Sequence, residues 1–144
     1  MMAVEQISVF VQNEKGALSH VLDALGAANI EIRALSIADT SDFGILRMIT
    51  DNNKKAQETL KKENYICTLT DVVAAAVDDR PGGLANHVNL LAAAGIDVEY
   101  LYAFVTRSDN EACVVFRVND TENAQKLLEK AGIRLVSQKD IENF

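Results

Sequence analysis

The sequence of 144 residues contains no tryptophan, one proline and two cysteines. Cys67 and Cys113 form no CxxC pair and stand among apolar or β-branched residues, so we expect buried, reduced thiols and no disulfide framework. No segment approaches the roughly 18 uninterrupted apolar residues of a membrane span. The start, MMAVEQISVF, lacks the basic and apolar regions of a signal peptide, which favours a cytoplasmic location.

Basic residues are also scarce, since 14 Lys and Arg stand against 21 Asp and Glu for a formal net charge of -7. Nucleic-acid-binding proteins normally present a basic face, so this balance argues against DNA or RNA as a partner. The apolar segments ILRMIT and ACVVFRV carry a single aromatic residue, Phe116, where an RNA-binding sheet would carry stacking rings.

The chain contains an internal duplication. A shift of 66 residues lays NEKGALSHVLDALGAANIEI, residues 13–32, on DRPGGLANHVNLLAAAGIDV, residues 79–98, and matches Gly16 with Gly82 and Leu25 with Leu91. Further on the shift becomes 68, where KKAQETLKK faces ENAQKLLEK. The sequence is therefore interpreted as two tandem copies, residues 1–70 and 71–144.

Each copy shows the same order of hydrophobic periods. In the first, Ile7, Val9 and Val11 alternate as in a strand, and the next apolar residues recur at helical spacing. Two further strands, a short helix that begins after an Asn, and the strand YICTL follow. The second copy begins with the strand VVAAAV and repeats the order. The order β-α-β-β-α-β predicts an α+β fold of two ferredoxin-like units, each with helices on one face of an antiparallel sheet.

This fold hosts many activities, so the chemistry must come from particular residues. His20 and His87 stand alone, which makes a metal site improbable, and His87 is expected in the core. Arg80 lies in the loop where an acylphosphatase holds phosphate, but in the first copy the basic residue, Lys15, stands at the next position, and no partnered asparagine motif is evident. No P-loop, nucleophile elbow or paired carboxylate is present, so we expect no catalytic residues, no cofactor and no metal.

The loop before the first helix of each copy carries the most specific signal. Asp79-Arg80-Pro81-Gly82-Gly83-Leu84-Ala85, followed by AGIDV, resembles the signature of the ACT domain, and Asn13-Glu14-Lys15-Gly16-Ala17-Leu18 is a weaker copy. The resemblance covers the whole chain as two ACT units. It implies a non-catalytic regulatory or sensor protein that binds an amino acid or a similar metabolite, usually at an interface between ACT units, and controls a partner protein.

A helix start offers backbone N–H groups that can receive a carboxylate, and glycine lets the ligand approach closely. The resemblance adds a polar loop residue and an acidic residue at the start of the second strand. The candidate ligand-binding residues are Asn13, Gly16, Ala17, Leu18, Ile30, Glu31, Asp79, Gly82, Gly83, Leu84, Ile96 and Asp97.

Several alternatives stay open at this point. Glycine at a first helical turn can be a steric necessity, and an interaction or dimerisation module without a metabolite ligand is the alternative function. The sequence does not decide whether one loop or both bind, which amino acid is bound, or which partner is regulated. Tyr100, Tyr102 and Phe104 alternate along a strand and predict a partly exposed apolar strip, which favours a homodimer.

Overall fold

The computed structural model describes residues 3–12, 14–39, 43–105 and 111–143. Within these residues seven strands form one sheet in the order β2-β3-β1-β4-β6-β5, with β7 beside β4. The strands are β1 (Val4–Gln12), β2 (Ile32–Asp39), β3 (Phe43–Thr50), β4 (Ile66–Asp78), β5 (Val98–Ala103), β6 (Glu111–Val118) and β7 (Leu135–Val136). The helices are α1 (Ala17–Ala27), α2 (Asn53–Lys62), α3 (Gly83–Ala93), α4 (Thr121–Lys130) and α5 (Gln138–Glu142).

The long strand β4 belongs to both copies. Its first half pairs with β1, from Phe10 opposite Ile66 to Val4 opposite Val72, and its second half pairs with β6 from Val73 onward. The segments YICTL and VVAAAV, expected as separate strands, are thus consecutive parts of one strand of 13 residues. The predicted boundary between residues 70 and 71 lies inside this strand and stays a prediction.

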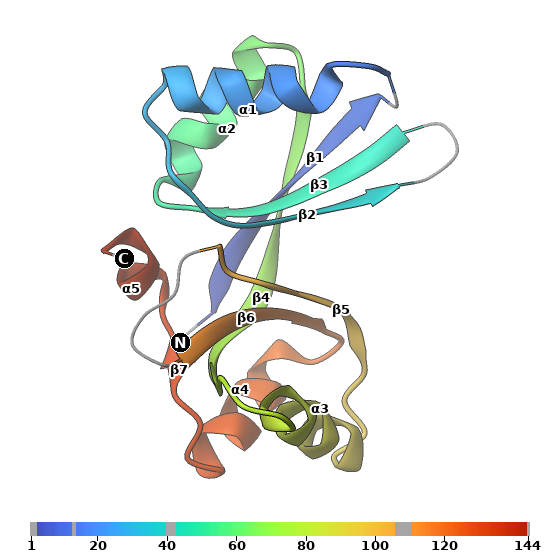
Figure 1. Cartoon of the computed structure of the whole chain (residues 1–144), viewed down its shortest axis with the longest axis vertical. Coiled ribbons are helices and arrows are strands. Elements are labelled where there is room, and N and C mark those ends of the chain that lie inside the picture. The colour runs from blue at the N-terminus through green and yellow to red at the C-terminus, as the bar shows by residue number, and fades with distance from the viewer. Residues whose placement is uncertain (1–2, 13, 40–42, 106–110, 144) are drawn as a thin grey trace.

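Each copy has the predicted α+β arrangement. Because β4 is shared, the continuous sheet divides into one part for each copy, here called the first and the second sheet. The first sheet runs β2-β3-β1-β4 and the second runs β5-β6-β4-β7, with antiparallel neighbours throughout. Figure 1 shows α1 and α2 covering the upper sheet and α3 and α4 covering the lower one, with the two sheets between them. An isolated bridge between Ala34 and Phe104 brings the end strands β2 and β5 together, so the strand order closes on itself.

The duplication is visible in the geometry. The first helices, α1 and α3, differ by 66 in number at both ends, and α2 and α4 differ by 68. The side chains of Asn52 and Asp120 cap α2 and α4 at equivalent positions, each accepting a backbone N–H three residues on. Asn29 and Gly95, both at positive φ, follow the ends of α1 and α3, as a helix C-terminus commonly requires.

The open faces of the two sheets pack against each other inside one chain. Val4, Ala34 and Ile49 of the first copy form a buried cluster with Tyr102 and Phe104 of the second. Tyr102 is 8% exposed and Phe104 is 7% exposed, so the prediction of a partly exposed strip is wrong for these two residues. Apolar residues alternate here because the first copy covers one side of this segment. A second chain is not needed to cover the strip.

A polar network crosses the same interface. The fully buried Gln6 donates through its amide nitrogen to the hydroxyls of Ser8 and Tyr100, at 3.1 and 2.9 Å, and accepts from the Tyr102 hydroxyl at 2.7 Å. Burial, followed by the neighbouring Tyr100, raises the pKa of Tyr102, so its hydroxyl stays a donor. Buried polar groups that satisfy one another in this way fix how two surfaces meet.

Helix α5 was not expected from the sequence. Ser137 and Asp140 form a capping box in which each side chain accepts the other residue's backbone N–H. Hydrogen bonds from Ser137 lower the pKa of the Asp140 carboxyl, which keeps it ionised at the helix start. The buried Ile141 anchors the helix in the cluster between the sheets, and the Ser-x-x-Asp spacing is the signal that could have revealed it. No helix in the described part of the chain is long and apolar enough to span a membrane.

Candidate functional site

The two loops before the first helices have the same backbone path. Gly16 and Gly82 are the N-caps of α1 and α3, with φ of 86° and 83°. This left-handed region favours glycine, which explains both residues without reference to a ligand. A glycine N-cap has no side chain to bond the helix start, unlike Asn52, Asp120 and Ser137 at the other three described helices.

A pocket of about 630 Å³ opens beside the first loop. Gly16 and Ala17, both predicted as site residues, line it together with the end of β1 and the turn from α2 into β4. The complete lining is Phe10, Val11, Gln12, Glu14, Lys15, Gly16, Ala17, Asn64, Tyr65 and Ile66. Its volume lies within the range of about 300 to 1,000 Å³ usual for small-molecule sites.

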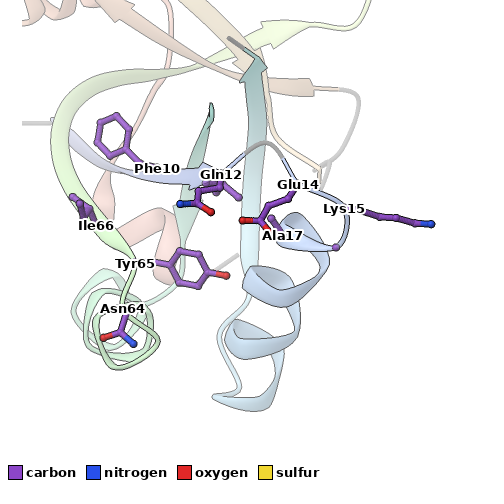
Figure 2. A pocket seen from close by; sticks show the side chains of 10 residues that line it. Phe10, Gln12, Glu14, Lys15, Ala17, Asn64, Tyr65 and Ile66 are labelled. Carbon is purple, nitrogen blue, oxygen red and sulfur yellow. The ribbon is translucent and has the colours of Figure 1, made fainter. Parts of the chain in front are cut away.

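The pocket has a polar side and an apolar side. Figure 2 shows the Glu14 carboxylate, the Gln12 amide and the Tyr65 hydroxyl turned toward the same space. Phe10 and Ile66 lie across from them and are 38% and 69% exposed, which is high for large apolar side chains. Lys15 points away from this space in Figure 2, so its charge is not directed into the pocket.

The Tyr65 hydroxyl contacts His20 of α1, which in turn lies near Glu63 at the end of α2. This hydroxyl lies 2.6 Å from Nδ1 of His20, and Nε2 of His20 lies 3.6 Å from the Glu63 carboxylate. Burial, then Glu63, then Glu14 raise the pKa of Tyr65, so the phenol is protonated near neutral pH. The site therefore presents a neutral hydroxyl beside the Glu14 carboxylate, a combination suited to a protonated amine.

The second loop differs in its local packing and its charge. Arg80 occupies the position equivalent to Glu14 and forms an ion pair with Asp78 at 3.3 Å. A Cβ on Gly83 would lie 2.2 Å from the Asp78 carbonyl oxygen, whereas Ala17 at the equivalent position of the first copy carries one. The Gly-Gly pair that made this loop look most like an anion site is therefore required by its own backbone. Asp79 and Leu84, also predicted, are exposed there.

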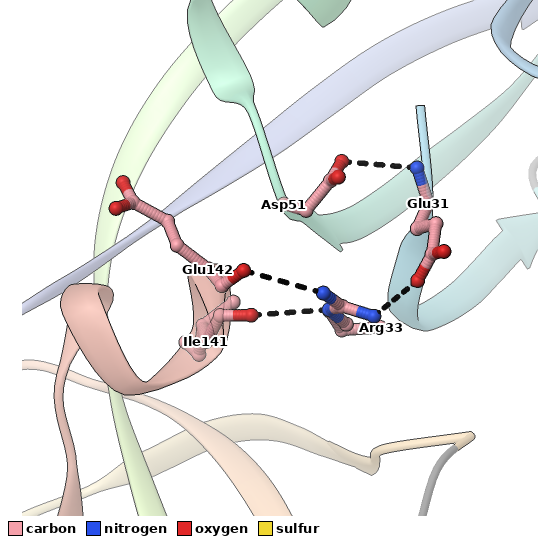
Figure 3. Close-up of polar contacts among 5 residues, drawn as sticks. All are labelled: Glu31, Arg33, Asp51, Ile141 and Glu142. Carbon is pink, nitrogen blue, oxygen red and sulfur yellow. Dashed lines mark hydrogen bonds and ion pairs between the residues drawn. The ribbon is translucent and has the colours of Figure 1, made fainter. Parts of the chain in front are cut away.

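The predicted acidic residues at the start of the second strands lie apart from the first pocket. Figure 3 shows Glu31 paired with Arg33, while the backbone N–H of Glu31 donates to Asp51 at 2.9 Å. Asp97 repeats the second contact, donating its N–H to Asn119 at 3.1 Å. Glu31 and Asp97 thus begin the second strands at the opposite end of each sheet from the loops.

The remaining predicted residues that the structure describes lie in or beside the two cores. Ile30 and Ile96 are buried in the cores beneath the helices. Leu18 packs against the first core and lines a smaller cavity of about 270 Å³ on the other side of the loop. Asn13, the proposed polar contact, lies outside the described residues.

Neither histidine belongs to a metal site in the described residues, which contain no group of three or more His, Cys, Asp or Glu side chains able to hold a metal ion. His87 is buried, as expected, and its Nε2 lies 2.8 Å from the Ala76 carbonyl. Its ring stacks with Phe116 at 6.4 Å between centroids. Cys67 is half-buried, which raises the pKa of its thiol, and Cys113 is buried.

Of the ten residues that line the pocket, sequence reasoning named only Gly16 and Ala17 as site residues. It missed Phe10, Val11, Gln12, Glu14, Lys15, Asn64, Tyr65 and Ile66. The predicted topology contained the signal, because the fourth strand runs antiparallel to the first and must begin where the first ends. The loop after β1 and the turn before β4 therefore had to be neighbours. The motif directed attention to the loop alone.

Comparisons with known proteins agree with this arrangement. The family model described as an ACT domain pair matches residues 2–144. Protein BT0572 from Bacteroides thetaiotaomicron has a similar structure, with 34% identity, a TM-score of 0.91, and coverage of 99% of this chain and 98% of that one. No curated protein matches.

More distant structures share the fold. The regulatory subunit of aspartate kinase from Thermus thermophilus, in its ligand-free form, has 16% identity and a TM-score of 0.64 over 88% of this chain and 91% of that one. The corresponding subunit from Thermus flavus has 16% identity and a TM-score of 0.62 over 92% and 94%.

Proposed function

The chain belongs to the family of ACT domain pairs, and from that premise we propose that it is a non-catalytic regulatory protein that binds an amino acid beside the loop between β1 and α1. The observation that carries the proposal is the pocket in which Glu14 and Tyr65 face Phe10 and Ile66. Its fold-level likeness to regulatory subunits of aspartate kinase supports a regulatory role. We propose the cytoplasm as its location and an enzyme or a second regulator as its partner.

The pocket offers a place for each part of an amino acid. The Glu14 carboxylate can accept hydrogen bonds from an α-ammonium group, with the Tyr65 hydroxyl as a second polar contact. The start of α1, where Gly16 provides no side-chain cap, can donate backbone N–H groups to the α-carboxylate. Phe10 and Ile66 then receive the side chain, which favours an amino acid with an apolar one.

The first loop is the better candidate on charge. Glu14 supplies an anion for the ammonium group, whereas Arg80 at the equivalent position is a cation already paired with Asp78. Binding at Asp79, Gly82, Gly83 and Leu84 stays a prediction of the sequence. It would need a ligand whose anionic group faces Arg80.

We expect one or more apolar amino acids to raise the thermal stability of the protein. A ligand at about 100 times its dissociation constant should add roughly 2.7 kcal/mol to the free energy of unfolding. A thermal-shift screen of the common amino acids, followed by calorimetric titration of those that act, measures this. A screen in which no amino acid shifts the transition would favour the alternative, an interaction module without a metabolite ligand.

The site itself is tested by Glu14→Gln, which keeps the shape of the side chain and removes its charge. Because a hydrogen bond to a charged group contributes about 1.5 to 3 kcal/mol, affinity should fall roughly 10- to 100-fold. Lys15→Gln is the matched control, since the neighbouring side chain points away from the pocket and its loss should leave affinity unchanged. Equal affinities for the two variants would show that the amino acid binds elsewhere. The second loop would then be tested by replacing Gly82 with a bulky residue.

A further inference from the structure

One edge of β4 is open beside the pocket. Over residues 66–72 this strand pairs with β1, and β6 begins to pair on the other side only at Val73. Among the residues that the structure describes, no strand lies along that second side between residues 66 and 71. Ile66, the first residue of the open stretch, is also part of the pocket lining.

Two hydrogen bonds show which backbone groups face the open edge. Arg117 of β6, on the side away from β1, donates from Nη1 to the Asp71 carbonyl at 2.8 Å. Ala76 donates its N–H to the Arg134 carbonyl at 2.9 Å, on the side of β7. Because alternate residues of a strand direct their N–H and C=O to opposite edges, Cys67, Leu69 and Asp71 direct theirs outward.

The contacts of β1 agree with this assignment. Glu5 lies opposite Asp71 in the register of β1 and β4. Its N–H donates to the Gln138 side chain at 3.1 Å, and its carbonyl accepts from the Asn53 side chain at 3.0 Å. Glu5 and Asp71 are therefore a pair that exchanges no ladder hydrogen bonds, and the backbone groups of Asp71 point to the open side.

Residues 66–70 of the open edge carry none of the usual protection against pairing. Exposed edge strands commonly carry a lysine, a proline or a bulge that prevents association with another strand. Here the residues are Ile66, Cys67, Thr68, Leu69 and Thr70, which include no charge and no proline. Ile66 is 69% exposed and Leu69 is 41% exposed, so apolar surface lies on both faces of the edge.

We propose that a second copy of this chain pairs with the edge of β4 in antiparallel fashion around a two-fold axis at Thr68. In this register Cys67 of each copy lies opposite Leu69 of the other, and both pairs exchange two backbone hydrogen bonds. Thr68 faces Thr68 of the second copy, a favourable cross-strand pair. Arg117 occupies the carbonyl of Asp71 and so limits the pairing to this short segment.

The occupant is a second copy because the edge is complementary to itself. The outward donors and acceptors of Cys67 and Leu69 exchange places under the two-fold rotation, as an isologous interface requires. The chain carries a formal net charge of -7, yet no like charges meet between residues 66 and 70. The inference goes beyond the proposed function, since the pairing needs no amino acid.

The test is the oligomeric state of the full chain without added amino acids, measured by sedimentation velocity up to about 100 µM. The wild type should be a dimer. Thr68→Lys and Thr68→Glu each place like charges across the axis and should raise the dissociation constant at least about tenfold. An equimolar mixture of the two variants should restore the dimer, because opposite charges then meet at the axis.

The matched controls are Asn89→Lys and Asn89→Glu on the exposed surface of α3, which should stay dimeric. A second variant, Thr68→Cys, should form a disulfide between copies on mild oxidation, because facing residues of this kind have Cα atoms about 4.5 Å apart. The wild type, whose Cys67 would face Leu69, should form none.

A monomeric wild type would overturn the proposal, as would Thr68 variants that dimerise like the parent or a mixture that associates no better than its components. These results do not depend on ligand binding. A monomer that still binds an amino acid would overturn the edge pairing alone, and a dimer that binds none would contradict only the proposed function.

Discussion

Replacing Arg33 with alanine is expected to lower the free energy of unfolding by about 3 kcal/mol. Arg33 is 5% exposed and lies on β2 of the first copy. Its Nε donates to the carbonyl of Ile141 at 3.0 Å and one Nη to the carbonyl of Glu142 at 3.5 Å, while the other pairs with Glu31. These carbonyls end α5, so a single guanidinium satisfies the helix C-terminus and binds the second copy to the first (Figure 3).

Urea denaturation measures the loss, and hydrogen exchange shows where it acts. In Arg33→Ala the amides of Ile141 and Asn143, which are bonded within the end of α5, should lose protection before those of the strands. Arg33→Lys should retain part of the stability, because one ammonium cannot reproduce the planar set of donors.

Arg80→Ala is the control, since the ion pair of Arg80 with Asp78 is exposed and should contribute less than about 0.5 kcal/mol. If Arg33→Ala and Arg80→Ala had equal midpoints of urea denaturation, the apolar contacts of Ile141 alone would hold α5 in place.

The role of Arg33 illustrates what the sequence could and could not predict. The periods of Ile7, Val9 and Val11 predicted β1, and the repeat at 66 and 68 residues predicted equivalent helices, because these are local patterns. The alternation of Tyr100, Tyr102 and Phe104 correctly indicated one apolar side of β5. The alternation could not show that the first copy is what buries this side, because hydrophobic periodicity indicates which residues are buried and not what they pack against.

The continuity of β4 was hidden for a related reason. Asp71 interrupts the apolar pattern between YICTL and VVAAAV, which suggested a connection between two strands. In the structure Asp71 is exposed where the strand passes from the first sheet to the second, and its carbonyl is bonded by Arg117. A polar residue is tolerated inside a strand when that position faces solvent between two cores.

The candidate site was predicted in part because its loop is local in sequence. Gly16 and Ala17 follow from the motif, whereas Tyr65 and Ile66 come from a segment about fifty residues away that antiparallel pairing brings alongside. The charge of the pocket also required the structure, because only the side-chain directions show that Glu14 faces it and Lys15 does not.

Replacing Gly83 with alanine is expected to destabilise the protein by about 3 kcal/mol, a large effect for the addition of one methyl group. The new Cβ would lie 2.2 Å from the Asp78 carbonyl oxygen and 3.3 Å from its carbon. Because both are backbone atoms at the end of β4, relief requires the helix start or the strand to move. Gly82→Ala meets no atom within 4 Å, and its cost, from a φ of 83°, should be only about 1 to 2 kcal/mol.

Ala17→Gly is the matched variant in the first copy, where it removes the Cβ that the second copy cannot accept. It should cost at most about 1 kcal/mol, through lost helix propensity and lost packing of the Ala17 methyl against the first core. Urea denaturation of all three variants measures this. The expected order of destabilisation, from largest to smallest, is Gly83→Ala, then Gly82→Ala, then Ala17→Gly. This order would show that the second loop is packed tightly against its own strand and that the first loop is not. If Gly83→Ala left the free energy of unfolding unchanged, this loop could open at little cost. The residues from Asp79 to Leu84 would then be as good a candidate ligand site as the first loop.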